Sequence, residues 1–176
     1  MQQGHFYFIS DEYYNIFDPN KKLMQNKESI KGKPHDRPCF FAFPDKNQPH
    51  IFWCVPISSK LDKYKTIHDY KIEKQKQKGK RHPKCNTIRF GEVLGQNRAF
   101  LIQNIFPVTA KYIQSAYIDK NTGNEVTISP QTEKDIINNA NDVLRLAFRG
   151  VPILFADVKE IYASLSKRLD ISSNDE

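Results

Sequence analysis

Two apolar runs in the first third of the chain read Cys39-Phe40-Phe41-Ala42-Phe43 and Ile51-Phe52-Trp53-Cys54-Val55-Pro56-Ile57. Aromatic and β-branched residues are typical of strands, and the polar segment 44–49 between the runs predicts a hairpin loop. In an antiparallel hairpin the outer ends of the two strands lie side by side. We therefore expect this hairpin to be the centre of the fold.

Polar residues flank the outer end of each run. The first run is preceded by His35, Asp36 and Arg37, and the second is followed by Ser58, Ser59 and Lys60. Because the two ends of the hairpin adjoin, these side chains are expected to converge at one end of a sheet. A histidine, an arginine, a lysine and two hydroxyl groups together suit the binding and polarisation of a phosphate.

Length and composition predict an ordinary globular protein. The 176 residues favour a single domain, 1–176, in which 170–176 are expected to fray. Hydrophobic residues make up 39% and charged residues 27%, which excludes an intrinsically disordered chain. The net charge of +7 favours a polyanionic partner, nucleic acid before a membrane.

The cysteine pattern excludes two other classes of protein. Cys39, Cys54 and Cys85 are too few for a disulfide framework, and their spacing does not match a zinc site. The first two are expected to be small buried residues within strands. We find no secretory leader and no apolar run long enough to span a bilayer. These features predict a reducing, cytoplasmic location and no metal or cofactor.

The segments around the hairpin have their own patterns. They predict a strand at 5–9 and a short helix at 11–17 with Ser10 as its N-cap. Residues 20–36 are polar and rich in lysine, which predicts a long loop, either functional or disordered. After the hairpin, Ser59 is expected to cap a helix, because apolar residues follow at helical spacing.

The second half of the chain changes from strand to helix periodicity. Further strands are predicted at 87–94, 98–102, 105–108 and 125–128. A turn is expected at 95–97, and 113–118 fit either a helix or a strand. Ser129-Pro130 predicts the start of a helix that ends at Gly150, and a last helix is expected from about Asp157. Short strands without βαβ alternation predict an α+β fold with a small, curled, barrel-like antiparallel sheet.

A dense run of positive charge follows the helix that begins near residue 60. This basic tongue, 71–85, contains one acid, Glu73, and seven cations: Lys71, Lys74, Lys76, Lys78, Lys80, Arg81 and Lys84. We expect these cations to contact nucleic-acid phosphates with salt-dependent affinity, together with His82, Lys33, Lys63, Thr87 and Arg89. Strand alternation predicts that Thr87 and Arg89 point to one face. A solvated charge run is the alternative interpretation of the tongue.

Several aromatic side chains are candidates for stacking on nucleic-acid bases. They are Tyr64, Tyr70, Phe106 and Tyr112. For each of them core packing is the competing expectation, and Trp53 is expected to be a core residue.

Three short motifs resemble a known family. Phe-Tyr-Phe-Ile-Ser (6–10), Arg-Pro-Cys-Phe (37–40) and Val-Pro-Ile-Ser-Ser-Lys (55–60) resemble the toxins of type III toxin–antitoxin systems, the ToxN/AbiQ/CptN group. The segment from Leu94 to Asn104, with the following Pro107, is similar to the CptN/TenpN branch. The resemblance spans roughly residues 5 to 168.

The resemblance implies a fold and an activity. Members of this group are metal-independent endoribonucleases whose SH3-like barrel, elaborated with helices, resembles that of the MazF/Kid/PemK toxins. They cleave RNA, often at adenine-rich sites, and leave a 2′,3′-cyclic phosphate. A pseudoknot-repeat RNA antitoxin, which the toxin cuts from a precursor, inhibits them in a closed toxin–RNA assembly. The systems act in phage defence by abortive infection and in plasmid maintenance.

The same resemblance suggests roles for individual residues. Hydroxyl residues and a lysine after the second hairpin strand belong to the active site of ToxN, and Ser58, Ser59 and Lys60 match them here. The ToxN lysine lies one residue later, where this chain has Leu61, so that either Lys60 or Lys63 takes the role.

Metal-free RNA cleavage requires proton transfer and stabilisation of a phosphorane. His35 is the candidate acid or base, with an exposed loop histidine as the alternative. Arg37 and Lys60 are candidate phosphorane stabilisers, and Ser58 and Ser59 are candidate donors. Two rival functions stay open: a non-catalytic RNA-binding module, and a MazF-type toxin inhibited by a protein.

Overall fold

The computed structural model describes residues 1–24, 28–30, 33–35 and 37–173, and of 28–30, 33–35, 172 and 173 it describes the backbone alone. The strands are β1 (Phe6–Ile9), β2 (Glu28–Ile30), β3 (Lys33–His35), β4 (Cys39–Pro44), β5 (Ile51–Ser58), β6 (Arg89–Val93), β7 (Gln96–Phe100), β8 (Phe106–Thr109) and β9 (Ile113–Ala116). The helices are α1 (Asp11–Phe17), α2 (Leu61–Gln77), α3 (Pro130–Phe148) and α4 (Val158–Ser173), with short 3₁₀ turns at η1 (Ile102–Asn104) and η2 (Ala110–Tyr112).

The hairpin of β4 and β5 is the centre of the sheet, as predicted. Among the described residues the seven-stranded sheet runs in the order β6-β7-β5-β4-β1-β9, with β8 also paired to β5. β5 is antiparallel to β4 along one edge, and its other edge pairs with β8 at the start and β7 at the end. The last residue of β5 is therefore held by a strand on its far side, with Ser58 opposite Ala99.

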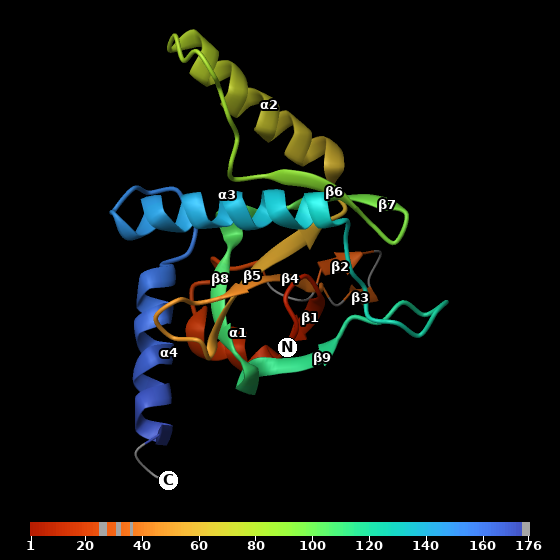
Figure 1. The fold of residues 1–176 in the computed structure, drawn as a ribbon, viewed down its shortest axis with the longest axis vertical. Helices are drawn as coiled ribbons and strands as arrows, with labels where there is room; N and C mark the ends of the chain where they lie inside the picture. The colour runs from red at the N-terminus through yellow and green to blue at the C-terminus, as the bar shows by residue number, and fades with distance from the viewer. Residues whose placement is uncertain (25–27, 31–32, 36, 174–176) are drawn as a thin grey trace.

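The sheet is antiparallel, as expected, but over the described residues it does not close into a barrel. Helices and an antiparallel sheet together make an α+β fold. The strands β6 and β9 stand at the two ends of the strand order and do not pair with each other, so the sheet is open. The sheet curls along β5, because the first half of this strand pairs with β8 and its last two residues pair with β7. A bulge in β4 between Phe41 and Phe43 adds a local bend. Figure 1 shows the strands with α3 across them and α4 along one side.

Two apolar clusters lie on opposite faces of this sheet. One joins Trp53, Val55 and Ile57 of β5 to buried residues of α3, such as Ile136 and Ala140. The other joins Cys54 and its neighbours to α1 and to α4. Strand alternation explains the division, because successive side chains of β5 point to opposite faces. In Figure 1, α3 crosses in front of the strands and α4 runs down one side.

α2 belongs to a third, smaller cluster. Tyr64 is the buried residue of this helix, and it packs with Ile88, Ala99 and Leu101. The helix rises away from the rest of the molecule beyond this contact (Figure 1). Because so few apolar side chains of α2 are covered, its outer half is held mainly by polar contacts. Among the described residues no helix is both long and apolar enough to cross a membrane.

Several predicted boundaries are wrong for identifiable reasons. Part of the expected loop 20–36 forms the antiparallel pair β2 and β3, although its lysines and glycine predict irregular backbone. The turn of the β6–β7 hairpin is Leu94-Gly95, not 95–97, because both residues adopt the positive φ that a two-residue turn needs. Residues 113–116 are a strand, whereas the segment 125–128 contributes only an isolated bridge between Glu125 and Ile118.

The helix ends also differ in detail. The N-cap of α2 is Lys60, one residue after the expected Ser59, and Ser10 caps α1 without a side-chain hydrogen bond. Ser129 caps α3 as predicted, accepting a hydrogen bond from the Thr132 backbone amide. α4 continues to Ser173, so the tail expected from residue 170 begins as helix. The packing of Leu169 against the core explains this extension.

Gly91 in β6 allows that strand to approach α3 closely. A Cβ atom at this position would lie 2.5 Å from Cγ2 of Thr132 and 3.2 Å from a ring carbon of Phe100. We expect Gly91→Ala to lower the free energy of unfolding by about 1–3 kcal/mol through overpacking, measured by urea denaturation. Adding Thr132→Ser removes the clashing methyl group and should restore part of the loss, whereas additive losses in the double variant would contradict this explanation.

Candidate functional site

The junction of β5 and α2 brings three of the predicted residues together. Ser58 is buried at the end of β5, and its hydroxyl accepts a hydrogen bond from the backbone amide of Lys60 at 3.2 Å. Ser59 and Lys60 are exposed, and Lys60 is the N-cap of α2. Two hydroxyl groups and an ammonium group therefore lie on consecutive residues of one tight turn. These groups can donate hydrogen bonds to an anion such as a phosphate.

Arg37 lies at the same end of the sheet. Cys39 pairs with Pro56, and continuing this register by two residues places position 37 opposite Ser58. Arg37 is half-buried, and its positive charge acts on the thiol of Cys39. The predicted convergence of Arg37 with Ser58, Ser59 and Lys60 is thus consistent with the register of the hairpin.

His35 and Lys33 belong to β3, whose backbone alone is described. His35 is the last residue of β3, and β4 begins four residues later at Cys39. The short connection keeps His35 near the start of β4. Their side chains, and therefore their predicted roles, lie outside the described part of the structure. Asp36 also lies outside the described residues.

The two strand cysteines are core residues, as expected. Cys39 and Cys54 are both fully buried. Burial raises the pKa of the Cys39 thiol to about 12, although Arg37 and a hydrogen bond with Tyr14 act in the opposite direction. Burial also raises the pKa of Cys54 well above its usual value. Both residues are therefore neutral thiols at neutral pH and not nucleophiles.

The basic tongue divides into an internal lysine and an exposed set. Lys71 turns inward, and its ammonium group donates to Oγ1 of Thr87 and to Oε1 of Gln103, each at 2.7 Å. Thr87 and Gln103 are buried. Desolvation lowers the pKa of Lys71, partly opposed by the thiol of Cys85. Lys71 and Thr87, both expected to contact RNA, therefore bind each other in this structure.

Thr87 and Arg89 do not share a face, which corrects the prediction from alternation. The hydroxyl of Thr87 meets α2, whereas Arg89 forms an ion pair with Asp135 of α3. The reason is that β6 begins only at Arg89, so Thr87 precedes the regular alternation of the strand. Arg89 stays partly exposed, with 46% of its side chain accessible.

The rest of the tongue folds back along α2 and presents its cations to solvent. Gln75 holds the returning chain, donating to the carbonyl of Lys84 at 2.7 Å and accepting from the Lys84 amide at 3.1 Å. The exposed cationic side chains are Lys74, Lys76, Lys78, Lys80, Arg81 and Lys84, with His82 also exposed. Lys63 is exposed on the first turn of α2, with its ammonium group 5.5 Å from the centre of the Tyr64 ring.

The two kinds of lysine can be separated by a matched pair of variants. Lys71→Met leaves the oxygens of Thr87 and Gln103 buried without their donor, and we expect it to lower the free energy of unfolding by about 1–3 kcal/mol. Lys74→Met changes an exposed lysine on the same helix and should alter stability by less than about 0.5 kcal/mol. Urea denaturation measures both values. Equal effects from the two variants would contradict the internal role of Lys71.

Most of the candidate stacking residues are core residues. Tyr64, Phe106 and Tyr112 are at most 7% exposed, which confirms the competing expectation for these three. Tyr70 is 64% exposed on α2, and the ammonium group of Lys74 lies 5.8 Å from the centre of its ring. Tyr70 is therefore the one candidate of the four that can offer a ring face to a base.

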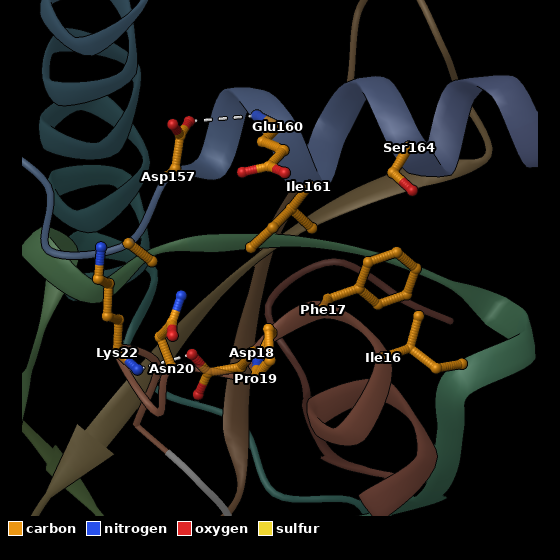
Figure 2. A pocket seen from close by; sticks show the side chains of 11 residues that line it. Ile16, Phe17, Asp18, Pro19, Asn20, Lys22, Asp157, Glu160, Ile161 and Ser164 are labelled. Carbon is orange, nitrogen blue, oxygen red and sulfur yellow. Dashed lines mark hydrogen bonds between the residues drawn. The ribbon is translucent and has the colours of Figure 1, made fainter.

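A hollow between α1 and α4 has the wrong charge for RNA. It has a volume of about 210 Å³, and its lining includes Asp18, Asp157 and Glu160. Figure 2 shows Asp157, just before α4, and Glu160 of α4 on one side, facing Asp18, Asn20 and Lys22 on the other. Asp18 accepts hydrogen bonds from the backbone amides of Lys22 and Leu23. Negative charge here is unfavourable for a phosphate group, so this hollow is not a candidate RNA site.

Two features of the molecule were not predicted from the sequence. Gln103 was not expected to hold a lysine, and the only signal was a polar side chain beside apolar Leu101, Ile102 and Ile105. A cavity of about 280 Å³ beside Trp53 was also missed. It is lined by side chains from the β4–β5 hairpin, α3 and α4, and an aromatic residue after the apolar stripe of α3, Phe148, was its only signal.

Comparisons with known proteins support the fold. No protein-family model matches the sequence, and no curated protein matches it. Among solved structures the chain is similar to AbiQ, a lactococcal anti-phage endoribonuclease belonging to the type III toxin–antitoxin system. The TM-score is 0.60 at 16% sequence identity, and the match covers 95% of this chain and 99% of AbiQ. This chain therefore shares its fold with AbiQ over nearly the whole length of both proteins.

Proposed function

We propose that this protein is an endoribonuclease toxin of a type III toxin–antitoxin system that acts in phage defence by abortive infection. The observation that carries the proposal is the likeness of fold to AbiQ over 95% of this chain and 99% of that one. The sequence resemblance to the same group supports it independently, since it rests on short motifs and not on the fold. The closer likeness to the CptN/TenpN branch, and to SH3-like barrels of the MazF type, stays a prediction.

The proposed catalytic centre is the end of the β4–β5 hairpin. There the ribose 2′-hydroxyl of the substrate attacks the adjacent phosphorus, the 5′-oxygen leaves, and a 2′,3′-cyclic phosphate results. Lys60 and Arg37 stabilise the charge of the phosphorane, and Ser58 and Ser59 donate hydrogen bonds to its oxygens. His35 either takes the proton of the 2′-hydroxyl or gives a proton to the leaving 5′-oxygen, and solvent water is the partner of the other transfer. The reaction so written requires no metal ion, and the preferred substrate is RNA with adenine-rich sites.

The proposed partner is an RNA antitoxin of pseudoknot repeats, which the protein cuts from its precursor and then binds in a closed assembly. The exposed cations of the basic tongue support this part of the proposal, because they lie on the outer half of α2, which rises away from the molecule (Figure 1), and on the segment that returns along it. Phosphate contacts of this kind give affinity that falls steeply with salt. A single domain working in the cytoplasm is part of the same proposal.

One experiment distinguishes the proposed function from a non-catalytic RNA-binding module and from a MazF-type toxin. In it, the RNA that co-purifies with the protein from its host is extracted, and the precursor of that RNA is incubated with the purified protein in EDTA. The expected result is a discrete bound RNA and cleavage of the precursor to ends with a 2′,3′-cyclic phosphate. A discrete RNA without any cleavage would favour a non-catalytic RNA-binding module. Cleaving protein that carries no RNA, and is neutralised by a neighbouring protein, would favour a MazF-type toxin.

A further inference from the structure

Three aromatic rings form the wall of the cavity beside Trp53. The rings of Trp53 and Tyr162 are parallel, with 4° between their planes and 5.9 Å between their centres. The ring of Phe148 stands nearly perpendicular to both, at 6.2 Å from Trp53 and 5.8 Å from Tyr162. Phe148 is 43% exposed, whereas Trp53 is 1% exposed. The cavity therefore has a buried aromatic floor and one aromatic side open to solvent.

Asp45 holds this wall in a fixed geometry. Its carboxylate accepts hydrogen bonds from Nε1 of Trp53 at 3.0 Å and from the hydroxyl of Tyr162 at 2.8 Å. It also accepts from the backbone amides of Asn47 and Gln48 in the hairpin loop. By accepting these hydrogen bonds, the charged carboxylate of Asp45 fixes the orientation of the Trp53 and Tyr162 rings. The cavity is thus built before any ligand arrives, which limits the entropy cost of binding. The cavity lining holds two cations, Lys46 and Arg145, against this one carboxylate.

The rim of the cavity carries positive charge and amide groups. Lys46 and Arg145 line it, as do Asn47 and Asn141. The ammonium group of Lys159 lies 6.0 Å from the centre of the Phe148 ring. Arg145 pairs with Asp142 at 2.8 Å, but both side chains are about half exposed, and such a pair contributes little free energy. Arg145 can therefore turn to a phosphate at low cost.

We propose that this cavity binds one unpaired purine base of RNA, with the adjoining phosphate held at the rim. Aromatic walls suit a base, which stacks on such rings, and the cations of the rim suit its phosphate. The volume of about 280 Å³ lies at the lower limit of small-molecule sites and fits one ring system better than a helix or a folded peptide. An amide such as that of Asn141 can form two hydrogen bonds with adenine. The inference rests on the proposed function only for the source of the base, RNA.

This cavity is separate from the proposed catalytic centre. Trp53 precedes Ser58 by five residues of one strand, which corresponds to about 17 Å at the rise of a β-strand. The side chains of Trp53 and Ser58 also leave β5 on opposite faces, because their positions differ by an odd number. Binding of a base can therefore be measured without any cleavage.

The experiment uses the single tryptophan of the chain as the reporter. Trp53 forms the floor of the cavity, so its emission changes when a ligand contacts the rings around it. The intact protein is titrated with 5′-AMP, 5′-UMP and ribose 5-phosphate, none of which has an internucleotide bond to cut. The expected result is a saturable change with AMP, a weaker one with UMP, and none with ribose 5-phosphate.

Two phenylalanine variants test the location of the site. Phe148→Ala removes the open wall and should weaken AMP binding by about tenfold or more, whereas Phe148→Tyr should keep it. Phe155→Ala changes another exposed phenylalanine, 61% accessible and outside the cavity, and should bind AMP like the wild type. Circular dichroism and urea denaturation confirm that each variant is folded. If Phe148→Ala were itself unstable, the Asn141→Ala variant on the surface of α3 provides the same test.

The outcomes separate this inference from the proposed function. No saturable response to AMP, equal affinity in Phe148→Ala, or equal affinity for ribose 5-phosphate would each overturn the base cavity, even if the protein cleaves RNA. Saturable AMP binding lost in Phe148→Ala would support the cavity, even if the protein cleaves nothing.

Discussion

Lys60→Ala should lower the rate of RNA cleavage by at least about a hundredfold while RNA binding changes little. The reason is that removing one preorganised donor from the site of developing charge costs about 10² to 10³ in rate. The affinity for RNA should change little, because Lys60 is one of many cations and the exposed tongue supplies the other phosphate contacts. Single-turnover cleavage of the antitoxin precursor measures the rate, and electrophoretic mobility at fixed salt measures the affinity.

Lys63→Ala is the matched control, because Lys63 stands on the adjoining turn of α2 and is also exposed. The geometry favours Lys60, whose backbone is tied to the hydroxyl of Ser58. We expect the cleavage rate of Lys63→Ala to stay within about a factor of three of wild type, since a solvent-exposed charge outside the reacting centre contributes little. Loss of cleavage in Lys63→Ala alone would transfer the role to that lysine. Full activity in both variants would place the catalytic centre elsewhere.

Asp45→Ala should be the most destabilising of the substitutions considered, lowering the free energy of unfolding at neutral pH by about 3 kcal/mol or more. The change removes the acceptor for Trp53, Tyr162 and two loop amides at once. Hydrogen bonds to charged groups contribute about 1.5–3 kcal/mol each, and buried donors left without an acceptor add to the loss. Asp119→Ala is the matched control, because Asp119 accepts hydrogen bonds only within its own turn and should lose about 1 kcal/mol or less.

The same variant should change the response to acid. Burial by itself would raise the pKa of Asp45, but hydrogen bonds from Trp53, Tyr162 and the loop amides outweigh burial and lower the pKa below its usual 3.8. In acid the unfolded chain therefore binds this proton before the folded chain does. The contribution of Asp45 is fully present above about pH 4 and is lost as the pH falls through the lower folded pKa. The stability difference between wild type and Asp45→Ala should thus narrow below pH 4, and a difference that widens in acid would refute this explanation.

The parts of the fold that were predicted are those that local patterns determine. The β4–β5 hairpin follows from two apolar runs around a polar loop, and α3 follows from Ser129-Pro130 and an apolar stripe. The barrel-like shape expected for the sheet is not confirmed, because whether β6 and β9 meet depends on long-range packing that no local pattern encodes. The pair β2 and β3 was missed because backbone pairing can form in a segment without apolar alternation.

The arrangement of the candidate site residues follows from local sequence only in part. Ser58, Ser59 and Lys60 are consecutive, and the hairpin register, continued from Cys39 and Pro56, places position 37 opposite Ser58, so sequence order was sufficient to group them. Lys71 was assigned to RNA because its neighbours along the chain are basic. Its inward direction depends on Gln103, which is 32 residues away in sequence. The aromatic cavity likewise joins Trp53, Phe148 and Tyr162 from three separate segments, and such contacts are visible only in the folded chain.

The unequal anchoring of β5 and α2 has a consequence for local opening. β5 has hydrogen-bonded neighbours on both edges, so its amides should exchange with solvent only when the whole domain unfolds. The outer half of α2 is held by the side chains of Lys71 and Gln75, and its amides should exchange through small local fluctuations. Ser58 would then be a fixed point in the molecule, whereas the cations of the tongue belong to a segment that can open and close by itself. The basic tongue could therefore adjust to an RNA of irregular shape, while the residues proposed for catalysis stay in place.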